Sequence, residues 1–340
     1  MAFNILNVGR LTLGASCIGG SKKAIADSAK YSKERVAFGK PIGEFGLIRA
    51  MLANMAIRTF ALESMVYRAA GMIDRSMQAS TGADKTQHLM KVLEEYAIEC
   101  SIGKVYGSEA FDDVLDQAVQ IFGGYGFHEE YPVARPYRDS RVNRIFEGTN
   151  EINRMLIIQM LMKRALSGTL PLLAAGTRLQ EEIMSGPSFS EAAEGPWAGE
   201  ERLLAGAKKA FLLAAGAPMQ KFREKLGDQQ EIVGALADIV IEIYAMESAL
   251  LRAQKAESLR GAAGIAAMRA AAGVLLEEGA GRIETHARAA LAASVEGDML
   301  RTQLAVLRRF LKREPVDVIG LKRVVADAVA AANRYPFDWQ

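Results

Sequence analysis

Three glycine-containing segments hold the residues whose types and spacing could do chemistry. They are residues 35–40 (RVAFGK), 120–126 (QIFGGYG) and 144–152 (RIFEGTNEI). Glycine leaves main-chain atoms uncovered, so a ligand can approach the backbone there. In the third segment the carboxylate of Glu147 is followed directly by Gly148, just before an expected helix start. This carboxylate would face any ligand above that turn, but the spacing alone names no reaction.

Each segment also has a structural interpretation that needs no ligand. The first can be a helix C-terminus at which a cation interacts favourably with the helix dipole. The second can be a tight turn between helices, and the third can place a glutamate on the solvated surface. The second segment is not GxGxxG and follows no predicted strand, which excludes a Rossmann-type site.

Metal and thiol chemistry are not predicted. His88, His128 and His286 are scattered along the chain, so no zinc-type ligand set is visible and we expect no metal site. Cys17 and Cys100 lie on separate apolar-patterned segments without CxxC spacing. We expect two buried thiols in a reducing compartment.

The elements that position these segments are predicted to be helices almost throughout. Apolar residues recur at steps of three, four and seven, the period of a helix with one buried face. The pattern predicts helices over about 3–34, 46–76, 84–118, 149–165, 201–226, 229–258, 261–293, 297–312 and 316–334. Strand signals are nearly absent. We therefore predict an all-α chain of two consecutive helical bundles, with domains at 1–166 and 201–340 joined by a linker at 167–200 that is rich in glycine, proline, serine and glutamate.

Composition restricts the function classes further. The 340 residues are 50% hydrophobic and carry 42 basic against 40 acidic side chains, a formal net charge of +2. A chain with no basic surplus is not expected to bind nucleic acid by neutralising phosphates. No stretch reaches the ~18 uncharged apolar residues that span a bilayer. The first residues already have a helical pattern, so we expect no secretory or transit peptide here.

Together the three segments resemble the acyl-CoA dehydrogenases. The resemblance is carried by residues 34–42 (ERVAFGKPI), 120–126 and 144–152, in that order, and covers residues 1 to about 165. The long segment that follows is similar to the C-terminal extension of the very-long-chain branch, and residues 7–10 (NVGR) point the same way. The resemblance implies an enzyme that converts long-chain acyl-CoA to trans-2-enoyl-CoA in fatty acid β-oxidation, with FAD as cofactor and an electron-transfer flavoprotein as acceptor.

The resemblance also assigns roles to single residues around the substrate. Glu147 matches the general base that removes the α-proton, a task that needs a positioned carboxylate. Gly148 matches the position where the thioester carbonyl approaches the backbone. Asn7 and Arg10 match positions that contact the CoA part of the substrate. Some relatives carry the base on the first helix, where this chain has Gly9, so Glu147 is the one base that we expect.

A second set of positions matches contacts to FAD, some of them across a subunit interface, which implies a homodimer. Free N–H groups at the start of a helix suit a cofactor phosphate. The matching residues are Arg35, Phe38, Gln120, Ile121, Phe122, Gly123, Gly124, Thr149, Asn150 and Glu151.

Residue 1 aligns with the start of the third part of the family fold. We therefore expect that the family's N-terminal helical domain and middle β-domain lie outside this chain. Two other interpretations stay open from the sequence: a non-catalytic helical module for dimerisation and membrane docking, and an acyl-CoA oxidase. We expect a cytoplasmic location in a bacterium, and the mitochondrial matrix or the inner-membrane face in a eukaryote.

Residues 170–184 (LPLLAAGTRLQEEIM) form a candidate surface element with an apolar face. Such an element can lie in a membrane interface without spanning the bilayer. It can equally cover the junction between the two bundles. Glu181 and Glu182 against a single basic Arg178 predict weak attraction to anionic lipid.

Overall fold

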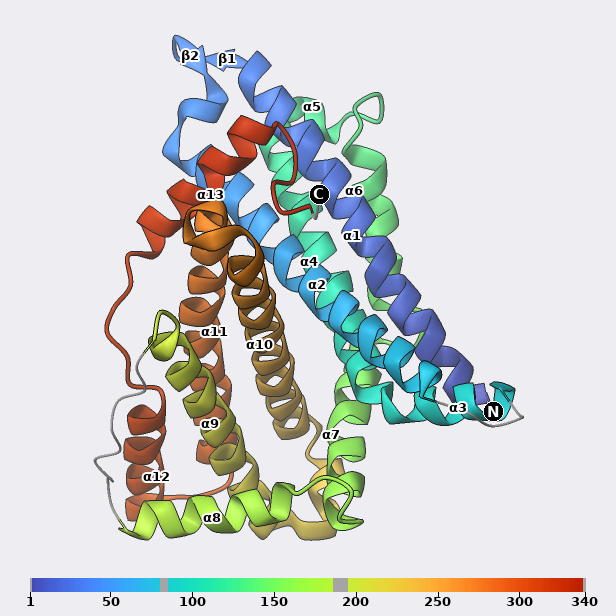
Figure 1. Ribbon diagram of the computed structural model, residues 1–340, viewed down its shortest axis with the longest axis vertical. Helices are drawn as coiled ribbons and strands as arrows, with labels where there is room; N and C mark the ends of the chain where they lie inside the picture. The colour runs from blue at the N-terminus through green and yellow to red at the C-terminus, as the bar shows by residue number, and fades with distance from the viewer. Residues whose placement is uncertain (1, 80–84, 186–194, 339–340) are drawn as a thin grey trace. The chain divides into compact units, whose positions relative to one another are not determined.

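The computed structural model describes residues 2–79, 85–185 and 195–338. These residues are helical almost throughout, which confirms the all-α prediction (Figure 1). No described helix combines the length and hydropathy needed to cross a membrane. The described chain forms two compact units. The first contains residues 1–150, 248–275 and 317–340, and the second contains 151–247 and 276–316. The domain boundaries expected from sequence stay a prediction.

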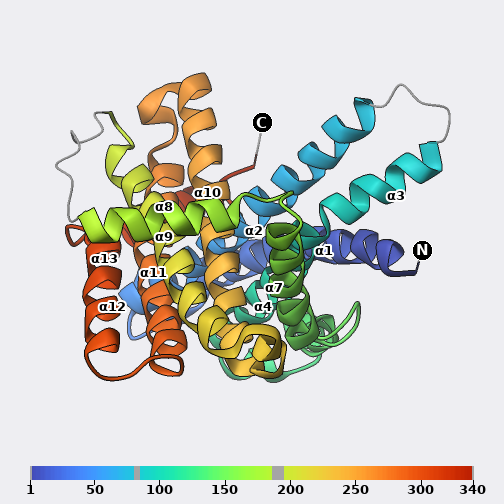
Figure 2. The same cartoon turned by 90° about the horizontal axis from the view of Figure 1, so that it is seen from below.

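The first unit is built on three long helices, α1, α2 and α4, which contact one another (Figures 1 and 2). Its elements are α1 (Ala2–Glu34), β1 (Val36–Ala37), β2 (Lys40–Pro41), η1 (Ile42–Glu44), α2 (Gly46–Gln78), α3 (Lys85–Glu95), α4 (Ala97–Phe122), α5 (Gly124–Phe127), α6 (Ala134–Ser140), η2 (Arg141–Arg144), the last part of α10 (Gln230–Gly264), the first part of α11 (Ala266–Ala292) and α13 (Val318–Ala332). The one helix predicted over 84–118 is two helices, because the chain turns at Tyr96 (φ −97°, ψ 19°) before α4 begins. The strands β1 and β2 pair as a short antiparallel hairpin.

Helices α1 and α4 approach closely because glycines face each other where they meet. A Cβ on Gly14 would lie 3.1 Å from the carbonyl oxygen of Gly103, and a Cβ on Gly107 would lie 3.2 Å from the Cα of Gly14. Larger residues at these positions would push the two helices apart. This contact places the N-terminal half of α1 against the first turns of α4. The predicted site residues Asn7 and Arg10 lie on this half of α1.

The second unit is a separate group of helices. Its elements are α7 (Asn150–Leu166), α8 (Leu172–Ser185), α9 (Ala198–Phe222), η3 (Arg223–Asp228), the first part of α10 (Gln230–Gly264), the last part of α11 (Ala266–Ala292) and α12 (Gly297–Phe310). Helices α8 and α12 both pack against α9. The stretch 167–200, expected to be a linker, therefore contains helix α8. The apolar residues of α8 recur with the period of a helix, and one of them, Leu179, is buried.

A buried carboxylate joins distant parts of the first unit. Glu63 of α2 is 4% exposed at its side chain and accepts hydrogen bonds from Arg252 Nη1 at 2.6 Å and from the Tyr335 hydroxyl at 2.7 Å. Lys22 of α1 pairs with the same carboxylate. Burial first, and then the charge of Glu63, raise the pKa of Tyr335 well above its usual value, so this hydroxyl stays protonated and donates. The cluster connects α1, α2, α10 and the segment after α13.

We predict that Glu63→Gln destabilises the first unit by about 3–5 kcal/mol, because it leaves the partly buried Arg252 and Lys22 without their shared negative charge. Urea unfolding followed by circular dichroism measures this loss. The matched control is Glu34→Gln, since Glu34 is exposed and forms only a 4.0 Å surface pair with Lys30. We expect a change within about 0.5 kcal/mol for this control. Equal stability of the two variants would show that the cluster contributes nothing.

Candidate functional site

The Glu147–Gly148 turn has an unusual backbone. It lies between η2 and α7, and both residues have left-handed torsions, with φ of 60° at Glu147 and 81° at Gly148. Glycine adopts this conformation readily, but for a glutamate it costs about 1–2 kcal/mol. Interactions from the surrounding helices must therefore hold the turn in place.

Two buried cations supply those interactions. Lys104 of α4 has no exposed surface and donates hydrogen bonds to the carbonyl oxygen of Gly148 at 2.8 Å and to Asn150 Oδ1 at 2.6 Å. Arg10 of α1 is 3% exposed and donates from Nε to the carbonyl oxygen of Glu147 at 3.1 Å. A buried cation without acceptors is costly, so both side chains fix the main chain of the turn.

Asn150, the first residue of α7, joins the turn to α4 a second time. Its Nδ2 donates to Glu109 Oε1 at 2.9 Å and to Ser108 Oγ at 3.0 Å. The side chain is 2% exposed and its hydrogen-bonding atoms already have protein partners. A cofactor contact at Asn150 stays a prediction.

Asn7 and Arg10, expected to contact CoA, are both buried in the first unit. Asn7 Nδ2 donates to the carbonyl oxygen of Leu93 at 3.0 Å, and Asn7 Oδ1 accepts from Arg10 Nη1 at 3.1 Å. Burial lowers the pKa of Arg10, while the charges of Cys100 and Glu147 oppose that shift. The structure thus shows these two residues supporting the Glu147 turn. Their contact with CoA stays a prediction.

The carboxylate of Glu147 lies against the bare backbone of Gly9. A Cβ built on Gly9 would lie 2.6 Å from the Glu147 carboxyl carbon and 2.6 Å from each of its oxygens. No side chain fits at position 9 while Glu147 keeps this conformation. Positions 9 and 147, at which different relatives are expected to carry the base, are therefore neighbours in space. The half-buried Glu147 side chain occupies the volume that a residue larger than glycine would fill.

A second group of predicted site residues gathers at the other end of α1. The Arg35 guanidinium lies 5.8 Å from the ring centroid of Tyr125. Tyr31 stacks on Phe122 with centroids 4.1 Å apart, and its hydroxyl donates to the Phe122 carbonyl at 3.3 Å. Phe38, at the tip of the β1–β2 hairpin, is 95% exposed. The end of α1, the hairpin and residues 120–126 thus form one surface.

This surface fits a cofactor that carries phosphate groups. A Cβ built on Gly123 or on Gly124 would meet no atom within 4 Å, so a ligand can pack directly against the main chain there. Arg35 is exposed beside it and can donate to a diphosphate. Thr149, Asn150 and Glu151 lie at the start of α7, directly after the Glu147 turn and not at this surface, and their contact with a cofactor phosphate stays a prediction.

The two groups of predicted residues do not form one site within this chain. Arg10 and Arg35 are separated along α1 by a distance of about 37 Å, at 1.5 Å of rise per residue. The Glu147 turn and the surface around Arg35 therefore lie at opposite ends of this helix.

Sequence reasoning missed the residues that hold the turn, Lys104, Ser108 and Glu109. A signal for Lys104 was present, because it is a cation on the buried, glycine-containing face of α4, beside Gly103. The prediction of buried thiols is confirmed for Cys17 and Cys100. Burial raises the pKa of each thiol to about 12, which makes them poor nucleophiles.

Comparison with known proteins adds a family to this geometry. Two family models match the chain, over residues 1–162 and 206–309, and both are described as "Acyl-CoA dehydrogenase, C-terminal domain". A "Probable acyl-CoA dehydrogenase" of Bacillus subtilis is 44% identical over 337 residues, which cover 98% of this chain and 57% of the relative. The "Very long-chain specific acyl-CoA dehydrogenase, mitochondrial" of Bos taurus is 34% identical over 275 residues, which cover 76% of this chain and 40% of the relative.

Solved structures agree. The "Crystal Structure of Acyl-CoA Dehydrogenase complexed with FAD from Bacillus anthracis" matches with a TM-score of 0.94 and 43% identity, over 98% of this chain and 57% of that one. Acyl-CoA oxidase3 from Yarrowia lipolytica matches with a TM-score of 0.65 at 16% identity, over 98% of this chain and 51% of that one, which shows a shared fold. The chain spans about half the length of the curated relatives it matches. With both of its helical regions matched, the chain belongs to the acyl-CoA dehydrogenase family.

Proposed function

We propose that the protein carrying this chain catalyses FAD-dependent α,β-dehydrogenation of long-chain acyl-CoA, with Glu147 as the general base. The observation that carries the proposal is the Glu147 carboxylate, seated against Gly9 in a turn that two buried cations fix. The names of the Bacillus relatives support the activity and the use of FAD. Relatives named as very-long-chain specific support the choice of long-chain substrates.

The chemistry follows from what this carboxylate can do. Glu147 takes the proton from the α-carbon of the thioester, and the electron pair of that bond forms the new α,β double bond. FAD, when bound, accepts the hydride that leaves the β-carbon. Gly148 has no side chain, so the thioester can approach the turn. Lys104 and Arg10 keep the main chain of the turn still while the proton moves, because both bind its carbonyl oxygens.

The surface around Arg35 contributes to a neighbouring copy of the protein. The distance along α1 that separates it from Glu147 supports this assignment, as does Phe38, a large apolar side chain that is almost fully exposed. In a C2 dimer each copy would offer this surface to the cofactor of the other. Arg35, Phe38 and the open backbone at Gly123 and Gly124 would then complete the partner's flavin site.

The electron acceptor, the other domains and the location follow from the same family. A relative named "Caffeyl-CoA reductase-Etf complex subunit CarC" from Acetobacterium woodii is 39% identical over 163 residues, which favours an electron-transfer flavoprotein. We propose that a β-domain and an N-terminal helical domain, in this or another polypeptide, complete the site. A cytoplasmic or mitochondrial location and peripheral membrane contact stay predictions.

We predict that Glu147→Gln removes nearly all dehydrogenation while FAD stays bound. Glutamine keeps the shape of the side chain but cannot accept the α-proton. The variant is made in the complete open reading frame that encodes residues 1–340. Acyl-CoA turnover is measured with a dye acceptor, and flavin content by absorbance. Wild-type turnover in Glu147→Gln would refute the assignment of the base. A purified wild-type protein without flavin would favour a purely structural role.

We also predict that Gly9→Ala sharply lowers kcat without changing flavin content. The added methyl group overlaps the present position of the Glu147 carboxylate, so the base must leave the position it occupies in this structure. Gly19→Ala is the matched control, because it lies on the same helix and its added Cβ meets no atom within 4 Å. We expect Gly19→Ala to keep full activity. Equal activity of Gly9→Ala and Gly19→Ala would show that Gly9 does not position the base.

Complementation between subunits tests the dimer. We predict that Arg35→Gln and Glu147→Gln are each nearly inactive alone but recover activity when coexpressed. In a mixed dimer, the copy with an intact base receives an intact Arg35 from its neighbour. Light scattering on the same samples gives the oligomeric state. Coexpression without recovery, or a monodisperse monomer well above assay concentrations, would exclude sharing of the site between subunits.

A further inference from the structure

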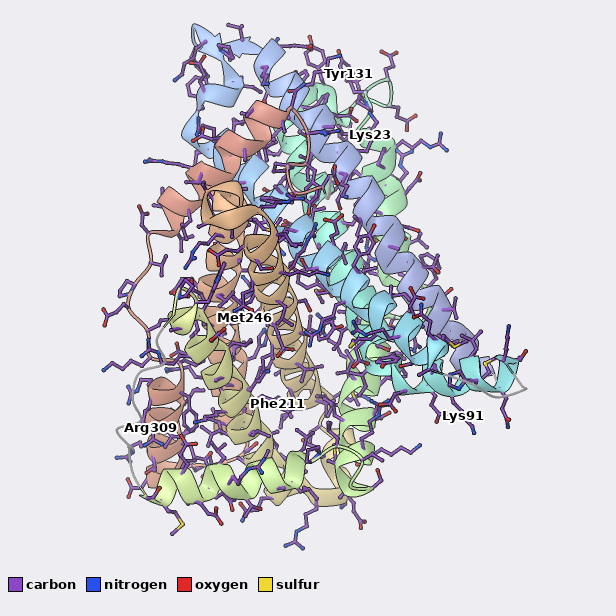
Figure 3. The ribbon with its side chains drawn as sticks, viewed as in Figure 1. Lys23, Lys91, Tyr131, Phe211, Met246 and Arg309 are labelled. Atoms are coloured by element: carbon purple, nitrogen blue, oxygen red, sulfur yellow. The ribbon has the colours of Figure 1, made fainter. Side chains whose placement is uncertain are left out.

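The second unit contains a cavity that none of the functional residues above uses. It has a volume of about 540 Å³ and lies among helices α7, α8, α9 and α12. Its walls are mainly apolar, and Phe211 of α9, labelled in Figure 3, is one of the lining side chains. Further lining residues are Ile158, Leu172, Ile183, Leu212 and Val306.

The size of this cavity argues for an occupant. Protein interiors are close-packed and contain few voids larger than a water molecule. An empty apolar space of this volume forfeits the contacts that its lining atoms would otherwise make. Pockets for small molecules fall between about 300 and 1,000 Å³ and have mostly apolar walls. The cavity therefore has the dimensions and the lining of a ligand site.

The lining also defines the chemistry of the ligand. None of the described residues that line the cavity is charged, so an ionised group inside it would have no partner. Gln303 of α12 is among the lining residues, and its Oε1 is buried without a hydrogen-bond partner. Such an atom is left unsatisfied unless a donor on the ligand reaches it. Thr177, Gln180, Gln220 and Thr302 are the other polar residues of the lining. The site therefore suits an uncharged, mainly aliphatic molecule that carries a hydrogen-bond donor for Gln303.

Helix α8 forms one wall of this cavity, so the apolar face of α8 lines the cavity. Leu172, Leu179 and Ile183 line the cavity, although the sequence offered this segment for a membrane interface or a junction between bundles. Leu173 on α8 and Met299 on α12 also line it and are 51% and 59% exposed. The cavity therefore reaches solvent beside these side chains, and a ligand can enter there.

We propose that this cavity binds an uncharged aliphatic chain, held most tightly when it carries a hydrogen-bond donor for Gln303, as a fatty alcohol does. The proposal goes beyond dehydrogenation and does not depend on Glu147. A long acyl chain of an acyl-CoA and a chain from a membrane lipid share the aliphatic part of this chemistry but have no donor for Gln303. Both place the charged headgroup outside the cavity.

The test measures binding of the uncharged fluorophore Nile red to the complete protein and its displacement by dodecanol. Gly176→Phe and Gly216→Phe fill the cavity from α8 and from α9. An added Cβ at either glycine meets no atom within 4 Å, and replacing a helical glycine does not reduce helix propensity. We expect each variant to weaken Nile red binding by about tenfold or more, as for a lost apolar site. Gly281→Phe, in open space on α11 outside the cavity, is the matched control.

Three further arms separate the possible outcomes. Gln303→Leu should weaken dodecanol by about three- to tenfold and leave Nile red unchanged, as for one lost hydrogen bond. Ionised dodecanoate should compete poorly. Dodecanoyl-CoA and vesicles of neutral phosphatidylcholine distinguish an acyl-CoA source from a lipid source. Equal Nile red binding in both cavity variants and Gly281→Phe, or equal competition by dodecanoate and dodecanol, would overturn the proposal. Unchanged binding in Glu147→Gln shows that this result is independent of the proposed function.

Discussion

The site in the first unit depends on one electrostatic requirement, the need of the buried Lys104 cation for acceptors. Lys104 has no exposed surface, so its ammonium group must be surrounded by oxygen atoms of the protein. Gly148 and Asn150 supply two of them, and they come from the segment that carries the proposed base. The position of the Glu147 turn is thus a consequence of where α4 places a charge. Removal of these acceptors would take two hydrogen bonds from a buried cation.

Magnitudes explain why the turn persists despite its backbone strain. Left-handed torsions at a glutamate cost about 1–2 kcal/mol. A hydrogen bond that involves a charged group contributes about 1.5–3 kcal/mol, and Lys104 and Arg10 each donate one to a carbonyl oxygen of this turn. The cations therefore outweigh the strain. Both effects require the close contact between Gly14 of α1 and Gly103 and Gly107 of α4. This contact brings α1 close enough to α4 for Arg10 to reach the turn.

The helices could be predicted from the sequence because each depends on a local repeat of apolar residues. The break at Tyr96 could not, because no glycine or proline near it marks a turn in the sequence. Long-range polar contacts were also out of reach. Glu63 and Arg252 are far apart in the chain, and each alone has the pattern of an ordinary charged residue on a helix. The sequence named Glu147 and Gly9, but the geometry of the turn depends on Lys104, whose acceptors Gly148 and Asn150 lie far from it in the sequence.

Glycines in this protein serve two opposite purposes that the sequence does not distinguish. At Gly9, Gly14 and Gly107 an added Cβ would touch protein atoms, so these glycines let elements of the protein approach one another. At Gly123, Gly124 and Gly176 an added Cβ would meet nothing within 4 Å. Gly19 and Gly281 are open in the same way, so open space beside a glycine does not by itself mark a ligand site. Gly123 and Gly124 differ because they lie near the exposed Arg35, and Gly176 differs because it lines the apolar cavity. Close contact at the first set positions the turn that carries the base, while the second set leaves backbone uncovered beside groups that suit a ligand.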